Sequence, residues 1–95
     1  MIFAKTVGTV VSTARSDEIG GAKFLLVREC SCKGEPQDSY LVALDAVQAG
    51  TGEMVLISQG SSCRQTETTY QKPIDALIVG IIDSIDERGN VVYRK

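Results

Sequence analysis

The residues that could carry chemistry in this chain are few, and their spacing builds no complete site. Cys30 and Cys32 flank a single serine, and their thiolates could hold a soft metal ion. A four-ligand metal site needs a second pair of ligands, however, and Cys63 is the only cysteine left to supply one. We therefore interpret these cysteines as ordinary thiols near a strand end and predict no metal site.

The sequence contains no histidine, so the commonest general base is missing. Neither a Ser–His nor a Cys–His nucleophilic pair can form without it. Gly50 and Gly52 lack the third glycine and the following helix of a dinucleotide-binding fingerprint, and no Gly-Lys-Ser/Thr completes a phosphate-binding loop. Asp83 and Asp86 could act as an acid/base pair, but solvated residues at a strand end are the simpler interpretation. We predict a protein that is not an enzyme and has no cofactor.

Length and charge restrict the partners. The 95 residues predict one domain, residues 1–95, with a thin core and little room for an enclosed cleft. The net charge of −2 provides no basic excess for nucleic acid. No segment approaches the roughly 20 continuous apolar residues of a membrane span, and Lys5 and Gly8 interrupt the N-terminal run. With an odd number of cysteines as well, we expect a cytosolic protein without nucleic-acid or membrane partners.

The local pattern predicts strands almost throughout, because β-branched residues are abundant. Polar turn-forming stretches at 20–21 and 33–38 separate the first three strands, and 86–90 is typical of a hairpin turn in which Gly89 or Asn90 takes a positive φ. One short helix is expected after 61–62, ending before Pro73. The expected strands are 2–13, 23–31, 40–47, 53–59, 76–85 and 91–94.

Three of these strands are apolar on both faces, at 24–27, 41–44 and 76–82, whereas a half-exposed antiparallel sheet should alternate. The chain has no helices to spare as a cover for the second face. We therefore expect a small closed barrel whose outer wall is buried against other copies of itself; a well-filled monomer core is the alternative. Gly8 and Gly80 lie inside strands, as a tightly curved barrel requires where it bends or where backbones approach.

Three blocks of sequence, in order, carry a family resemblance. They are Asp45-Ala-Val-x-Ala-Gly-x-Gly-Glu-x-Val-Leu56, Gly60-Ser-Ser-x-Arg64 and Pro73-Ile-Asp-Ala-x-Ile-Val-Gly-Ile-Ile-Asp83. Together with the strand at 2–11, they resemble the pentameric vertex proteins of bacterial microcompartments, the family of the ethanolamine-utilisation and carboxysome vertex proteins. The chain departs from the family pattern at Cys63, where many relatives have alanine, and at Gln48, where glycine is common.

The resemblance implies an all-β fold, an OB-like closed barrel of five strands with one short helix, to which the sequence adds a C-terminal hairpin. It also implies a structural shell protein of the bacterial cytoplasm: a homopentamer that caps the fivefold vertices of a microcompartment among hexameric shell proteins. An OB-type oligonucleotide-binding module is the alternative, because it shares the barrel. Such modules need a basic groove with stacking aromatics, and this chain has three tyrosines, two phenylalanines and no tryptophan.

Two glycine-containing loops are the candidate contact or pore region of the ring. Glycine would allow close backbone approach at 49–53, although an ordinary tight turn explains Gly50 and Gly52 equally well. Arg64 could pair across the contact with Glu53 or Asp83, and a solvated charge at a helix end is the alternative. The candidate residues are Ala49, Gly50, Gly52, Glu53, Gly60, Ser61, Ser62, Arg64 and Asp83.

Overall fold

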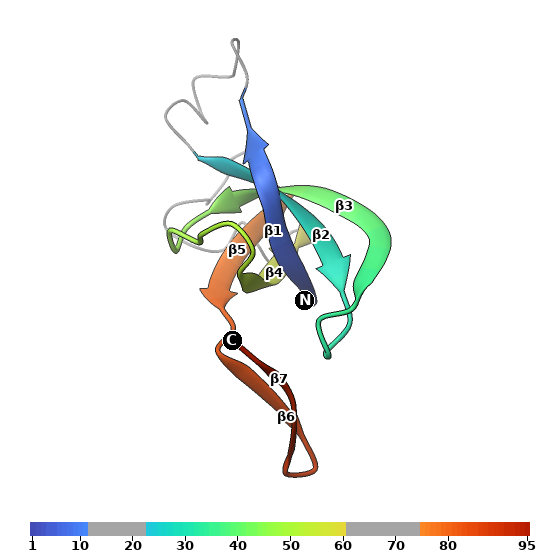
Figure 1. Cartoon of the computed structure of the whole chain (residues 1–95). Coiled ribbons are helices and arrows are strands. Elements are labelled where there is room, and N and C mark those ends of the chain that lie inside the picture. Colours follow the sequence, from blue (N-terminus) through green and yellow to red (C-terminus); the bar gives the residue numbers. More distant parts are fainter. Residues whose placement is uncertain (12–22, 61–74) are drawn as a thin grey trace.

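The computed structural model describes residues 1–11, 23–60 and 75–95, and these form a closed barrel followed by a separate hairpin (Figure 1). The barrel strands are β1 (Ile2–Val10), β2 (Phe24–Cys30), β3 (Pro36–Asp45), β4 (Met54–Gln59) and β5 (Ala76–Ile81). The hairpin strands are β6 (Ser84–Glu87) and β7 (Asn90–Arg94). The predicted five-stranded barrel and C-terminal hairpin are thus confirmed, whereas the expected short helix lies outside the described residues.

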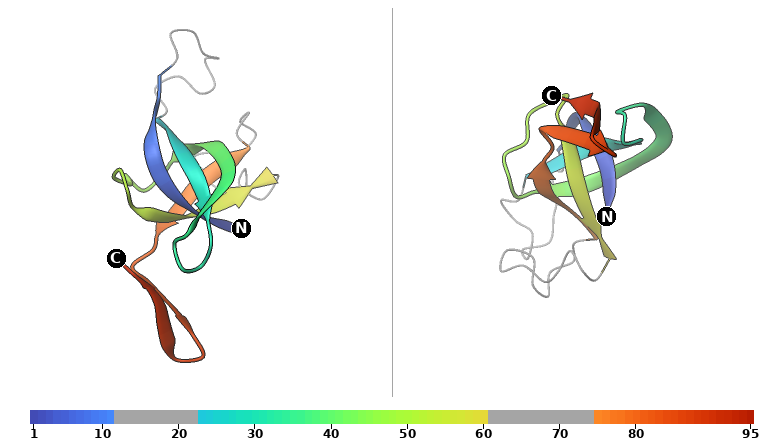
Figure 2. Two further views of the ribbon diagram at one scale, coloured as in Figure 1. Left: turned by 45° about the vertical axis from the view of Figure 1, so that its right-hand side comes forward. Right: turned by 90° about the horizontal axis from the view of Figure 1, so that it is seen from below.

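The barrel closes in the order β1-β2-β3-β5-β4, with β4 returning to pair with β1. All of these pairings are antiparallel except β3–β5, where Leu44 lies beside Leu77 and Asp45 beside Ile78 in a parallel register. The hairpin leaves the barrel after β5 and projects away from it in Figure 1 and in the left view of Figure 2. Among the described residues, no helix is long and apolar enough to cross a membrane.

The core lies inside the barrel and consists of aliphatic side chains from all five strands. Alanines, which are small, leave room there for the larger branched residues of β2, β4 and β5. The buried core residues include Ala4, Leu25, Val27, Ala43, Ala49, Val55, Ile57 and Ile78.

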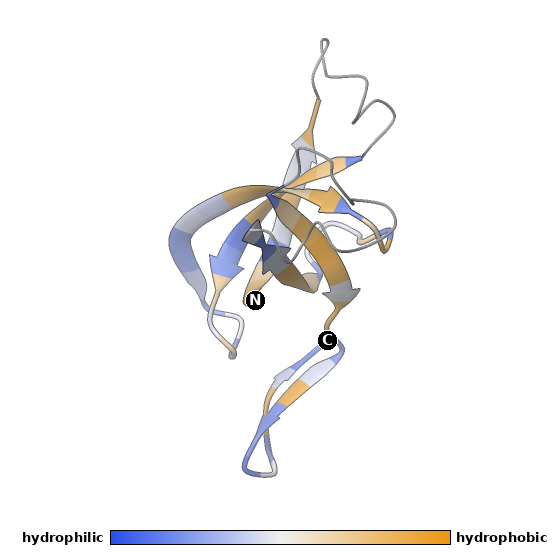
Figure 3. Cartoon of the chain, turned by 180° about the vertical axis from the view of Figure 1, so that it is seen from behind, coloured by the Kyte–Doolittle hydropathy of each residue, from blue (hydrophilic) through white to orange (hydrophobic). Residues whose placement is uncertain are grey.

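A second apolar cluster lies on the outer surface of the barrel. Leu44 and Leu77 are buried there, packed against Phe24 and Val79. Farther along the same side, Val42 remains 50% exposed. These strands are therefore apolar on both faces, as the sequence predicted, and Figure 3 shows stretches of consecutive hydrophobic residues along the barrel strands.

Two strand boundaries differ from the sequence prediction. β3 begins at Pro36 rather than at residue 40, because the turn is already complete by Glu35. Gly34 has φ +85°, its N–H donates to the Ser31 carbonyl (2.9 Å), and the Ser31 N–H donates to the Glu35 carbonyl (2.9 Å). Proline is tolerated as the first residue of a strand, since its missing N–H costs no ladder bond there.

The predicted strand 76–85 is divided into β5 and β6. The division falls at Ile82 and Asp83, where the chain leaves the barrel. The Ile82 N–H donates to the Met54 carbonyl (2.8 Å), and the Asp83 carbonyl accepts from the Lys95 N–H (2.8 Å). These two bonds fix the neck of the hairpin, so the apolar run at 76–85 serves two different sheets.

The hairpin turn contains two residues, Arg88 and Gly89, between the paired Glu87 and Asn90. Their φ angles are +53° and +84°, the pattern of a type I′ turn, which matches the twist of the strands. The positive φ expected at Gly89 is confirmed. The other positive φ of the turn is at Arg88 and not at Asn90.

Candidate interaction surface

The loop between β3 and β4, residues 46–53, lies at one end of the barrel and is held first by Asp45. The Asp45 carboxylate accepts from the Val47 N–H (3.1 Å) and, through both oxygens, from the Ala49 N–H (3.2 and 3.1 Å). Its side chain is 1% exposed, and Lys23 Nζ lies 3.7 Å from Oδ2. Because a carboxylate satisfies the first loop amides, the chain turns immediately after β3.

The far side of this loop is bonded to β1 through Thr6. The Thr6 N–H donates to the Glu53 carbonyl (3.0 Å), and the Gly52 N–H donates to the Thr6 carbonyl (2.9 Å). The Thr6 hydroxyl donates to the Gly50 carbonyl, and Thr6 itself is only 2% exposed. Ala49 is buried in the core cluster, so the loop is anchored to the barrel over most of its length.

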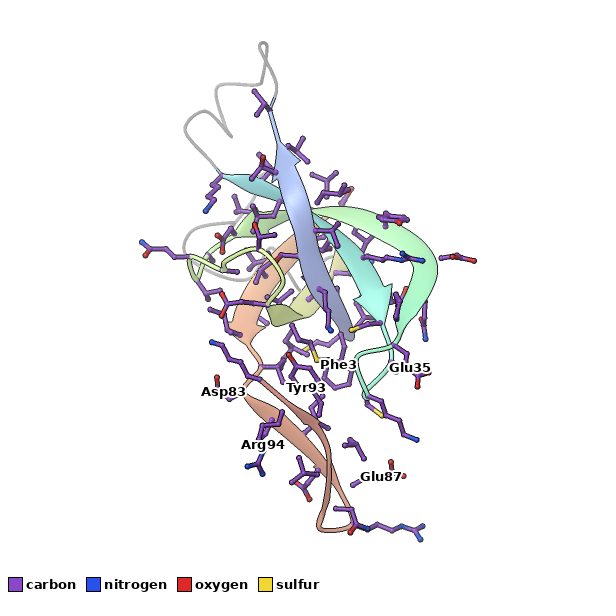
Figure 4. All side chains as sticks on the ribbon, viewed as in Figure 1. Phe3, Glu35, Asp83, Glu87, Tyr93 and Arg94 are labelled. Atoms are coloured by element: carbon purple, nitrogen blue, oxygen red, sulfur yellow. The ribbon has the colours of Figure 1, made fainter. Side chains whose placement is uncertain are left out.

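Glu53 connects this loop to the neck of the hairpin. Its Oε1 accepts from the Gly50 N–H, and its Oε2 lies 2.7 Å from Lys95 Nζ. The Lys95 N–H in turn donates to the Asp83 carbonyl, and Figure 4 shows Asp83 at this neck. The structure therefore joins three predicted residues, Gly50, Glu53 and Asp83. Lys95, the partner of both Glu53 and Asp83, is absent from the prediction, since no local pattern links it to residue 53.

The pKa values of this ion pair reflect the contact. The hydrogen bond from Lys95, and then the one from the Gly50 N–H, lower the pKa of Glu53 below its ordinary value of 4.5. The hydrogen bond to Glu53 raises the pKa of Lys95 above its ordinary value of 10.5. The pair is therefore charged across the whole neutral range.

The remaining predicted residues lie elsewhere. Gly60 follows the other end of β4, and at about 3.3 Å per residue this strand of six residues spans roughly 20 Å. Gly60 has φ +67°, and its N–H donates to the Asp75 carbonyl (2.9 Å). Ser61, Ser62 and Arg64 lie outside the described residues, so the pairing of Arg64 stays a prediction.

The structure explains both loop glycines within the chain. Gly52 has φ +86°, which residues with a side chain rarely adopt, and a Cβ there would meet nothing within 4 Å. A Cβ on Gly50 would lie 3.2 Å from Glu53 Oε1. The turn therefore requires Gly52, whereas a side chain at residue 50 would make the Glu53 carboxylate shift by a few tenths of an ångström. Gln48 has φ +58°. Glycine, which is common at this position in the family pattern, would adopt this φ without strain.

Of the cysteines, Cys30 is buried and Cys32 is partly buried, and Cys63 lies outside the described residues. Burial is the main cause that raises the pKa of the Cys30 thiol above its ordinary value of 9.0. A thiol of this kind reacts poorly, because the thiolate is the reactive form. No group of three potential metal ligands occurs among the residues that the structure describes.

The sequence and the fold match known proteins. Residues 1–83 match the family model described as ethanolamine utilisation protein EutN/carboxysome. The carboxysome shell vertex protein CcmL of Synechocystis is 42% identical over 95 residues, which is 100% of this chain and 95% of that protein. The structure of Gloeobacter violaceus CcmL has a TM-score of 0.95 at 39% identity, covering 100% of this chain and 98% of that one. The pentameric microcompartment shell protein GrpN from Rhodospirillum rubrum has a TM-score of 0.84 at 41% identity, covering 92% and 99%.

The backbone of the loop gives the first prediction. Gln48→Gly should raise the free energy of unfolding by up to about 1 kcal/mol. A residue with a side chain costs roughly 1–2 kcal/mol in the left-handed conformation, and glycine avoids this cost but loses more conformational entropy when the chain folds. Gly52→Ala should lower it by about 1 kcal/mol for the opposite reason. Urea unfolding at a fixed protomer concentration measures both changes. Two variants that are indistinguishable from the wild type would contradict the backbone assignment.

The Glu53–Lys95 pair gives a prediction on pH. Since the folded pKa of Glu53 is lowered, its contribution to stability is present above pH 4.5 and is lost as the pH falls through the lower, folded value. Since the folded pKa of Lys95 is raised, its contribution is present below pH 10.5 and is lost as the pH rises through the higher, folded value.

Unfolding free energies of the wild type and of Glu53→Gln should therefore differ most between these limits and converge in acid. The glutamine amide oxygen can still accept from the Gly50 N–H, so this variant removes only the charge. Lys95→Gln is the matched control and should show the same convergence. Parallel pH profiles for the wild type and both variants would rule out the ion pair.

Proposed function

This chain belongs to the EutN/CcmL family of bacterial microcompartment shell vertex proteins, and from that premise we propose that five copies of it form a closed ring at each fivefold vertex of the shell. It is a structural protein of the microcompartment shell in the bacterial cytoplasm. The observation that carries the proposal is the similarity to shell vertex proteins over the full length of the chain. The chain also shares its fold with a solved structure of such a protein.

A fivefold ring has a geometric purpose in a shell. Hexameric tiles pack into a flat sheet, and a sheet closes into a polyhedron only where fivefold units introduce curvature. We propose hexameric shell proteins as the neighbours of this ring. Within the ring, each copy presents one surface to the next copy and a different surface to the previous one, and a rotation that closes the circle limits the assembly to five.

The OB-type oligonucleotide-binding alternative is not favoured. Among the described residues, Tyr40 and Tyr93 each have a cation of the same chain near the ring, since Arg28 lies 5.2 Å from the Tyr40 ring centre and Lys5 lies 5.8 Å from that of Tyr93. A single-strand binder needs such rings free for base stacking, in a groove of positive charge. The net charge of −2 also opposes a polyanion. We further propose that the protein has no catalytic activity of its own.

We place the loop 46–53 at a contact between copies or at the central opening of the ring. Several bonds fix its backbone, yet Gln48, Gly50, Thr51 and Gly52 are exposed. A rigid exposed loop loses little conformational freedom when a partner packs against it. Gly60, at the other end of β4, is proposed for the same role together with Ser61, Ser62 and Arg64 of the sequence that follows it, and we propose that Arg64 pairs with a carboxylate of the next copy.

A large side chain at an exposed position of the loop 46–53 tests whether this loop lies at a contact between copies. Any side chain at Gly52 would strain the backbone, so Thr51→Trp is the cleaner change and Thr51→Ser is its control. Thr51→Trp should weaken the ring and leave the protomer folded, because a large side chain disrupts a packed contact. The oligomeric mass and the circular dichroism of both variants give the result. An intact ring with tryptophan at residue 51 would exclude the loop from the contact.

The vertex role is tested by mass and by deletion. The purified chain should be a pentamer by native mass spectrometry, and a persistent monomer at micromolar concentration would overturn the ring. In the cell, deletion of the protein should leave flat tiles that assemble into elongated, tubular or leaky bodies in electron micrographs, with the enzyme cargo still made. Normal closed polyhedra, in a strain with no second member of this family, would contradict the vertex role.

A further inference from the structure

The C-terminal hairpin pairs with no strand of the barrel among the described residues. Its strands, β6 and β7, form a sheet of two by themselves and project from the barrel (Figure 1). A hairpin of this kind is at best marginally stable on its own in water. Contacts with the barrel must therefore keep it ordered, and two side chains near the end of the hairpin make such contacts.

The first contact is made by Tyr93 of β7. Lys5 Nζ, on β1, lies 5.8 Å from the centre of the tyrosine ring. The turn between β2 and β3 lies against the same ring, since a Cβ on Gly34 would come within 3.3 Å of Tyr93 Cδ2 and 3.4 Å of Lys5 Nζ. Tyr93 thus packs between β1 and a turn whose glycine leaves room for it.

The second contact is made by Lys95, two residues farther along the chain. Its Nζ lies 2.7 Å from Oε2 of Glu53, the last residue of the loop 46–53. Side chains alternate along a strand, so Tyr93 and Lys95 share the side toward the barrel, whereas Arg94 lies on the other side. Figure 4 shows Tyr93 and Arg94 pointing to different sides of the hairpin. The hairpin is therefore held at two separate places, one beside β1 and the other at the loop.

The Glu53 carboxylate holds the hairpin and the loop at the same time. While Oε2 faces Lys95, Oε1 accepts from the Gly50 N–H. The neighbouring Ala49 N–H donates instead to the Asp45 carboxylate. A lysine on one oxygen restricts the rotation of the Glu53 side chain, so it also favours the hydrogen bond to the other oxygen. Of these two loop amides, only that of Gly50 depends on where the hairpin lies.

Both contacts are weak enough to be released. The Lys95 side chain is 52% exposed and that of Glu53 is 22% exposed, so solvent screens the ion pair. A cation over a partly exposed ring, such as Lys5 over Tyr93, is weak for the same reason. The hairpin can therefore leave the barrel without unfolding it.

We propose that the hairpin is a releasable arm, and that Glu53 couples its docking on the barrel to the order of the loop at Gly50. When the hairpin moves away from the barrel, Lys95 leaves the carboxylate, which is then free to turn away from the Gly50 N–H. The coupling acts equally in both directions. A partner that binds the ordered loop also favours the docked hairpin, and a partner that draws the hairpin away loosens the loop. The inference does not depend on the pentamer, because every residue in it belongs to one copy.

Amide exchange with solvent, measured by NMR on the ¹⁵N-labelled full chain, tests the arm and the coupling together. Tyr93→Ala removes the first contact without touching the loop. The amides of β6 and β7 should then exchange faster. The Gly50 amide should follow by roughly two- to fivefold, the range expected for the loss of an exposed ion pair, while the Ala49 amide should not change.

Lys95→Gln breaks the second contact directly and should speed exchange both in the hairpin and at Gly50. Arg94→Gln removes a cation from the neighbouring position, on the other side of the strand. It is the matched control and should change exchange at neither place.

Each contrary result bears on a distinct part of the proposal. Wild-type exchange in the hairpin of both Tyr93→Ala and Lys95→Gln would show that other contacts hold it and would overturn the arm. Faster exchange in the hairpin with an unchanged Gly50 amide would overturn the coupling. Faster exchange throughout the barrel, at core residues such as Ala4 and Val27, would also overturn the proposal, because the two side chains would then stabilise the whole fold.

Discussion

Barrel closure by the parallel pairing of β3 with β5 is the constraint on which the rest of this structure depends. The pairing places Leu44 beside Leu77 and Asp45 beside Ile78, at the point where β3 ends. Ile78 thereby completes the core, and the Asp45 carboxylate reaches the first amides of the following loop. Because the barrel is closed, its own five strands leave no free edge to which another chain could add a strand. The outer wall of the barrel carries apolar side chains such as Leu44, Leu77 and Val42.

Within the loop 46–53, Gly52 supplies the positive φ that the turn needs. The loop is rigid because Asp45, Thr6 and Glu53 hold its backbone inside one copy. A shell vertex protein needs such rigidity, since a ring of fixed curvature must be built from rigid units.

The sequence predicted the parts of the fold that local pattern determines. The strands, the closed barrel and the turn at Gly89 follow from β-branched residues, doubly apolar runs and turn chemistry. Pro36 was predicted to lie in a turn, because from sequence a proline at the first position of a strand looks the same as one inside a turn. The division of 76–85 was missed for a related reason: its apolar run continues unbroken while the chain passes from one sheet to another.

The candidate site was predictable only in part. The importance of Gly50, Glu53 and Asp83 came with the family resemblance, and the structure shows that the three are connected. Lys95, which connects Glu53 with Asp83, could not be found, because an ion pair between distant residues has no sequence period. Gly8 and Gly80 were expected where the curved barrel bends or where backbones approach, and both lie beside irregularities in strand pairing.

Electron cryomicroscopy of shells reconstituted from this protein and hexameric shell proteins would show whether this chain forms the fivefold vertices. We expect closed polyhedra in which the density at each fivefold axis fits five copies of the barrel. Closed shells whose vertices lack this chain, or in which it lies within the flat facets, would contradict it.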